Sequence, residues 1–208
     1  GADSSAVTSQ QRIVDSLPYS SSSSGSTDNV SLSYKGAKLG MISAEYFSGT
    51  VKSTDIPALT ERLYQDGFIN ESEYRSLGGV KADEATSQIA QSVHSLNDFI
   101  MNEAVDGDSE GAKSLMLAVD VLQRMDEPST ADSRRKEIEA YEFVSGYTEI
   151  LKETQAPADL IGNFEQVLKV FEALDTVRKN ELQTGALASY ASVQETFDEY
   201  NDEQNESS

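Results

Sequence analysis

The chain contains no cysteine and no tryptophan, and His94 is the one histidine among its 208 residues. Disulfide bonds, thiol nucleophiles and zinc–thiolate sites are therefore excluded. A lone histidine also excludes the paired Glu-x-x-His motifs of di-iron bundles and the H-E-x-x-H motif of zinc proteases. Because the sequence has no Walker loop, no G-x-G-x-x-G and no G-x-S-x-G, we expect no cofactor and no serine hydrolase site.

Basic residues are scarce. The chain has 36 acidic and 16 basic residues, a formal net charge of −20 and a pI near 4.2. Such a charge repels the phosphates of nucleic acids and the head groups of anionic lipids, so a cationic protein partner, or solubility alone, explains it better. The longest apolar run, residues 115–119, has five residues, so we expect no membrane insertion. The compartment stays open between the cytoplasm and, if a signal peptide was removed ahead of Gly1, the periplasm or the exterior.

The amino-terminal part is poor in apolar residues. Residues 1–29 include the serine-rich tract Ser20–Ser26, which predicts a flexible arm. Residues 30–200 are predicted to form a single helical domain, followed by an acidic tail at 201–208. Alternation of Val30, Leu32 and Tyr34 favours a small β-ribbon over residues 30–43, and a short helix over 41–47 is the alternative. Gly36 and Gly40 argue against a long helix here.

Residues 55–79 carry the sharpest local pattern and predict a helical hairpin. Pro57 suits the first turn of a helix, and Gly67 ends it. Asn70 is then the expected N-cap of a second short helix, with Glu73 at the capping-box position.

Amphipathic stripes after residue 84 predict five long helices. Their expected ranges are 84–104, 113–125, 130–154, 159–182 and 186–200. The segment Lys113–Met125 is apolar on most sides and is the predicted central helix. Short connections favour antiparallel neighbours, so the expected fold is all-α, an antiparallel bundle preceded by the hairpin and the flexible arm.

Two segments resemble parts of a calcium-binding EF-hand loop. Residues 66–70 with Glu73 match the second half of the loop, but its first and third ligands would be Arg62 and Tyr64. A structural helix–turn–helix is therefore the preferred interpretation. Residues 106–111 match the first half, so Asp106, Asp108 and Glu110 are candidate metal ligands, although a turn that caps the next helix through Asp108 or Ser109 explains them more simply. His94 and Asp98, four residues apart, are interpreted as a pair on a helix boundary.

The first function hypothesis is a non-catalytic protein-interaction module, such as a bacterial adaptor or a chaperone-like protein. Its candidate partner-binding residues are Phe68, Ile69 and Tyr74 on the hairpin. The alternative is a weak calcium-binding protein through the residues 106–110. A carboxylate-based hydrolase is the least favoured hypothesis, because the sequence does not indicate which carboxylates would face each other.

Overall fold

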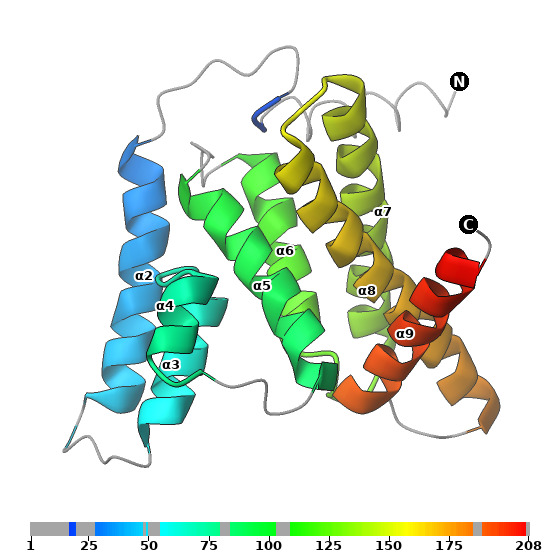
Figure 1. The fold of residues 1–208 in the computed structure, drawn as a ribbon, viewed down its shortest axis with the longest axis horizontal. Coiled ribbons are helices and arrows are strands. Elements are labelled where there is room, and N and C mark those ends of the chain that lie inside the picture. The colour runs from blue at the N-terminus through cyan, green and yellow to red at the C-terminus, as the bar shows by residue number, and fades with distance from the viewer. Residues whose placement is uncertain are drawn as a thin grey trace. The chain divides into compact units, whose positions relative to one another are not determined.

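A computed structural model describes residues 17–19, 28–47, 49, 55–79, 84–102, 109–184 and 189–206, and the side chains of 28–33, 84–87, 184, 190 and 203–206 lie outside the description. Within these ranges the fold is all-α, with eight helices and no strand (Figure 1). The predicted fold class is therefore confirmed. No helix in these ranges is both long and apolar enough to cross a membrane. Of the predicted arm, the serine tract Ser20–Ser26 falls outside the described residues. Residues 17–19 and 28–29 are described: Leu17 is fully buried and a helix begins at Asp28, so the expectation of a flexible arm is wrong for these residues.

The chain divides into two compact units. Unit 1 comprises residues 1–81 and 93–113, and unit 2 comprises residues 82–92 and 114–208. Two helices, α5 (Glu84–Asn102) and α6 (Glu110–Gln123), contribute residues to both units. Each unit has its own buried polar centre, and the two are described separately below.

Unit 1 begins with α2 (Asp28–Tyr46), followed by α3 (Ile56–Gln65) and α4 (Glu71–Ser76). The β-ribbon considered for residues 30–43 is wrong, because α2 runs through Gly36 and Gly40. A Cβ added at either glycine would meet no atom within 4 Å, so both face open space and only their intrinsic helix propensity is unfavourable. Tertiary contacts at every fourth residue outweigh that cost: Tyr34 and Lys38 make polar contacts, and Ile42 is buried.

The hairpin α3–α4 has the predicted local chemistry. Asn70 accepts a hydrogen bond from the backbone N–H of Glu73, and the Glu73 carboxylate accepts one from the backbone N–H of Asn70, which completes the capping box. Gly67 adopts φ +87°, a left-handed conformation that favours glycine. Asp55 precedes α3 as its N-cap residue without a side-chain capping bond, and Pro57 lies in the first turn. The turn geometry is thus set by residues 67–73.

Unit 2 contains residues 84–92 of α5 and residues 114–123 of α6. It also contains three long helices: α7 (Ala131–Glu153), α8 (Ala158–Thr184) and α9 (Tyr190–Glu206). The α8 helix packs against both α7 and α9. The predicted stripes form its core, with Phe164, Val167, Phe171 and Leu174 on α8 all at most 2% exposed. Helix α9 continues to Glu206, past its expected end at residue 200.

Helix α6 is less completely buried than predicted. Leu115, Val119 and Leu122 are at most 3% exposed, as expected for the inward stripe. Met116 and Leu117, however, are half-buried. The helix is therefore amphipathic: it is apolar on most sides, as predicted, but only the inward stripe is fully buried. Apolar side chains of α6 therefore extend beyond the side of the helix that is fully buried.

Candidate functional site

The predicted partner-binding residues lie on the α3–α4 hairpin and in the turn that joins its helices. Phe68, Ile69 and Tyr74 are all half-buried. Tyr74 stacks on Tyr64, with ring centroids 4.6 Å apart, and its hydroxyl donates to the carboxylate of Glu61. Much of the Tyr74 side chain therefore packs within the hairpin, whereas Phe68 and Ile69 keep part of their apolar surface open.

The stack continues to His94 on α5. The rings of Tyr64 and His94 are nearly parallel, at 7°, with centroids 4.3 Å apart. The His94 Nδ1 lies 2.7 Å from the backbone carbonyl of Tyr64, so in this contact the ring nitrogen donates. The predicted pair of His94 with Asp98 is wrong. His94 contacts Tyr64 of α3, and the Asp98 carboxylate accepts a hydrogen bond from Asn102. Burial, followed by Glu71 and Glu61, raises the pKa of Tyr64 to about 12.

A buried carboxylate explains why the EF-hand-like turn is structural. Asp66 is fully buried and accepts from Arg62 Nε at 2.8 Å, while Lys38 Nζ lies 3.4 Å from its other oxygen. The Asp66 carboxylate, which would face the cation in a calcium loop, is therefore occupied by two protein cations. Glu73 is held by the capping box. Both features agree with the preferred interpretation of a structural helix–turn–helix.

Asn97 connects three elements of unit 1. Its Oδ1 accepts from the Tyr34 hydroxyl of α2 at 2.6 Å, and its Nδ2 donates to the carbonyl of Gln65 at 2.8 Å. Asn97 is fully buried, so both hydrogen bonds form away from water and fix the register of α5 against α2 and α3. Burial raises the pKa of Tyr34, and the charge of Asp66 raises it further.

The second predicted site lies mostly outside the described residues. Asp106 and Asp108 fall there, and Glu110 is the exposed first residue of α6. The backbone N–H of Ala112 donates to Ser109 Oγ at 3.1 Å, so Ser109 acts as a capping residue, as the simpler interpretation expected. Among described residues no group of three His, Asp or Glu side chains is arranged to hold a metal ion. The metal assignment of residues 106–110 stays a prediction.

Sequence reasoning missed a set of exposed apolar residues. In the described part of the chain, seven large apolar side chains are exposed, and five of them belong to unit 1: Leu39, Met41, Phe47, Ile56 and Leu77, each 47–60% exposed. They lie on or beside α2, α3 and α4, the same elements that carry Phe68 and Ile69. A single exposed leucine is ordinary, but such a concentration is typical of an interaction surface.

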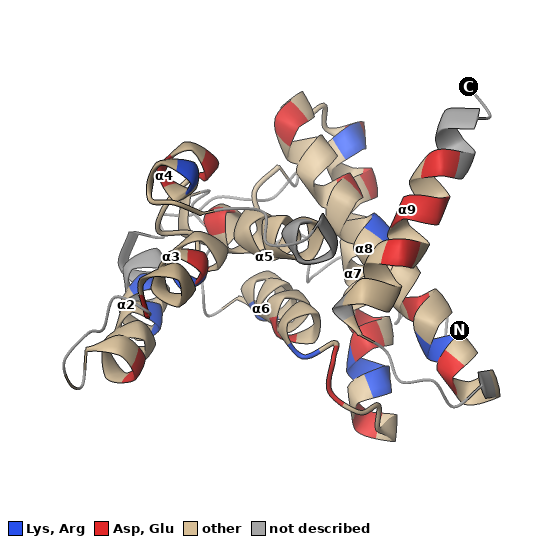
Figure 2. Cartoon of the chain, turned by 60° about the horizontal axis from the view of Figure 1, so that its bottom comes forward, with Lys and Arg blue, Asp and Glu red and all other residues tan. Residues whose placement is uncertain are grey.

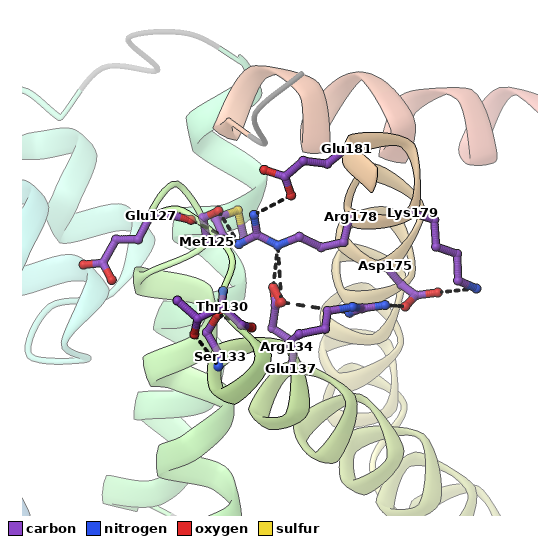
Figure 3. Close-up of polar contacts among 10 residues, drawn as sticks. All are labelled: Met125, Glu127, Thr130, Ser133, Arg134, Glu137, Asp175, Arg178, Lys179 and Glu181. Carbon is purple, nitrogen blue, oxygen red and sulfur yellow. Dashed lines mark hydrogen bonds and ion pairs between the residues drawn. The ribbon is translucent and has the colours of Figure 1, made fainter. Parts of the chain in front are cut away.

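Unit 2 has a buried ionic centre that the sequence did not reveal (Figure 3). Arg178 of α8 is 4% exposed and donates to four different partners, the weakest contact being that of Nη2 with the carbonyl of Glu127 at 3.5 Å. Its Nε lies 2.7 Å from Glu137 Oε1 on α7, its Nη1 lies 3.2 Å from Glu181, and its Nη2 lies 2.9 Å from the carbonyl of Met125. Arg178 thus ties the chain after α6 to α7 and α8.

Arg134 extends this centre to the protein surface. It lies 3.9 Å from Glu137 and also pairs with Asp175, which binds Lys179 Nζ at 2.9 Å. Burial alone would raise the pKa of Asp175, but the hydrogen bonds from Arg134 and Lys179 outweigh it, so the pKa is lowered. Every buried carboxylate among the described residues, Asp66 and Glu137, is therefore matched by nearby cations.

Comparison of the chain with protein-family models, with curated proteins and with solved structures gives no match.

Proposed function

We propose that this chain is a non-catalytic protein-interaction module that binds a cationic protein partner through unit 1. The carrying observation is the concentration of exposed apolar side chains on α2, α3 and α4. Such side chains contribute to binding when a partner removes them from water, at roughly 25 cal/mol per Å² of apolar area. We assign Met41, Phe47, Ile56 and Leu77 to this surface, together with the predicted Phe68 and Ile69. Leu39 lies two residues from Met41 on α2, about 200° around the helix axis, and therefore faces another side.

Carboxylates beside these residues support a cationic partner. Glu71 and Glu73 are exposed on α4, one or two turns before Leu77, and Glu71 also pairs with Arg75 at 2.7 Å. Glu45 is exposed one turn after Met41, and its partner Arg62 is shared with Asp66. An apolar surface rimmed by carboxylates favours an amphipathic partner whose apolar face is flanked by lysine or arginine.

Two features of the described residues support a non-catalytic role. The buried carboxylates Asp66 and Glu137 each lie in ion pairs with protein cations, which is the arrangement expected of structural carboxylates. His94 donates through Nδ1 to a backbone carbonyl and stacks on Tyr64, which is an arrangement typical of a packed structural histidine.

Site-specific photo-crosslinking tests this proposal. A photo-reactive amino acid at Leu77 should capture a partner from the native cell extract, whereas the same group at Glu153, an exposed position at the end of α7, should not. The captured protein is then purified and titrated against the parent chain and against Met41→Ser/Leu77→Ser. Both positions are more than half exposed, so the double variant should fold and melt as the parent does.

We expect the captured protein to carry a basic, apolar surface and to bind the double variant at least about tenfold more weakly, since two buried apolar anchors are lost. Equal capture at residues 77 and 153, or equal affinity for the parent and the double variant, would contradict the proposal.

A further inference from the structure

A groove of about 340 Å³ lies between α7 and α8 in unit 2. Its floor is apolar, formed by Phe171 and Leu174 of α8, which are at most 2% exposed. On the α7 side Ile138 is 43% exposed and Tyr141 is half-buried. The volume is within the lower part of the range of sites that accept a small ligand or one or two side chains of a partner.

A second groove, of about 530 Å³, lies on the other flank of α8, between α8 and α9. Its lining is polar and includes the carboxylates of Glu195 and Glu199. Lys179 lines both grooves and pairs with Asp175, so its side chain forms the ridge that separates them. The two grooves are therefore neighbouring parts of one surface on unit 2.

The charges of this surface are not balanced internally. Arg134 and Lys179, its two cations, both bind Asp175. Glu142, Glu195 and Glu199 are exposed and form no ion pair with any described residue. The surface therefore has unpaired negative charge next to an apolar groove.

Helix α9 adds to this negative charge (Figure 2). It has acidic residues and no lysine or arginine along Tyr190–Glu206. Glu195 and Glu199 are four residues apart on one face, where like charges repel each other. A cationic partner would relieve this repulsion.

We propose that these two grooves form a docking site for a basic amphipathic segment of a partner protein. An apolar side chain of that segment enters the α7–α8 groove and packs on Ile138 and Phe171. Lysine or arginine side chains on its flank pair with Glu195 and Glu199, across the ridge formed by Lys179. This site belongs to unit 2 and does not depend on the surface assigned to unit 1.

The test uses fluorescence anisotropy with a labelled 16-residue peptide of leucine and lysine arranged as an amphipathic helix. A scrambled peptide of the same composition controls for charge alone. Glu195→Lys is compared with Glu153→Lys, which changes the net charge of the chain equally but lies outside both grooves. Ile138→Ser is compared with Leu182→Ser, which removes an exposed apolar residue of α8 that lines neither groove. Leu77→Ser tests separately whether the peptide binds unit 1. Melting curves verify that all five variants are folded.

We expect the parent to bind the amphipathic peptide more tightly than the scrambled one. Glu195→Lys and Ile138→Ser should each weaken binding by about fivefold or more, as for the loss of one ion pair or one apolar contact, whereas Glu153→Lys and Leu182→Ser stay within about twofold. Equal effects of the two lysine variants, equal binding of both peptides, or no binding at millimolar peptide would overturn the proposal. Loss of binding in Leu77→Ser alone would place the peptide on unit 1, which overturns this site and leaves the proposed function standing.

Discussion

Replacing Arg178 by methionine should destabilise unit 2 more than any surface change of the same kind. The side chain is 4% exposed, and its loss leaves Glu137, which is 5% exposed, with only the distant contact to Arg134 at 3.9 Å. The carbonyl of Met125 loses its hydrogen bond as well. Removing one partner of a buried ion pair costs about 3–5 kcal/mol, because the remaining charge stays buried without compensation.

The matched control for Arg178→Met is Arg124→Met. Arg124 has the same side chain and a comparable ion pair, to Asp120 at 2.8 Å, but its side chain is 64% exposed. Exposed ion pairs contribute roughly 0–1 kcal/mol, so this variant should differ little from the parent. The two substitutions remove the same atoms, and therefore their difference measures the effect of burial.

Urea denaturation followed by circular dichroism gives the free energy of unfolding. An unchanged slope m shows that the variant exposes the same surface on unfolding as the parent. Because the chain has two compact units, hydrogen exchange of α7 and α8 amides reports unit 2 specifically. The double variant Arg178→Met/Glu137→Leu removes both charges and should recover a large part of the loss. A loss below about 1 kcal/mol in the free energy of unfolding of Arg178→Met would refute the buried ion pair. It would also be refuted if the loss in the double variant equalled the sum of the losses measured for Arg178→Met and for Glu137→Leu alone.

Four further substitutions test other parts of the fold. Gly40→Ala should stabilise α2 by about 0.5–1 kcal/mol because its Cβ meets open space, whereas Gly67→Ala should destabilise the hairpin in thermal melts, since φ is +87° and a Cβ would lie 3.3 Å from the carbonyl carbon of Asn97. The pKa of Tyr64 is raised from 10.0 to about 12, so its ionisation favours the unfolded state at high pH. Its contribution to the free energy of unfolding, at most about 2–3 kcal/mol, is present below pH 10 and lost as the pH rises through 12. In urea titrations over that pH range, the stability of Tyr64→Phe should therefore decline less than that of the parent. Val119→Asp places a charge at a position 3% exposed and should unfold unit 2 at a much lower temperature; a melt like that of the parent would mean that α6 is not part of the core.

Local chemistry explains which elements the sequence predicted well. The capping box of Asn70 and Glu73 and the left-handed Gly67 need only neighbouring residues, and both were predicted. The apolar stripes of α7 and α8 repeat every three or four residues, so their helices and buried faces were also predicted. Prediction succeeded wherever the information lies within one or two helical turns.

Helix α2 and the ionic centres depend on residues far apart in the chain. Val30, Leu32 and Tyr34 alternate, but residues 30 and 34 are equally compatible with one face of a helix, and contacts such as that of Tyr34 with Asn97 decide the outcome. Arg178 and Glu137 are 41 residues apart, and nothing local distinguishes them from exposed charges. The hairpin could be located from the sequence, but the exposed fraction of each of its side chains could not.

The two buried ionic centres also affect the charge that the chain presents to a partner. Each buried carboxylate of the described residues recruits two cations: Lys38 and Arg62 contact Asp66, and Arg134 and Arg178 contact Glu137. These four cations belong to a chain with 16 basic residues in total, and they are half-buried or buried. Using basic residues internally leaves the solvent-facing surface more acidic than the composition alone indicates. The net charge therefore favours cationic over anionic partners. In the function and docking site proposed above, the exposed apolar residues of unit 1 and the α7–α8 groove of unit 2 would supply the short-range contacts that a charge alone lacks.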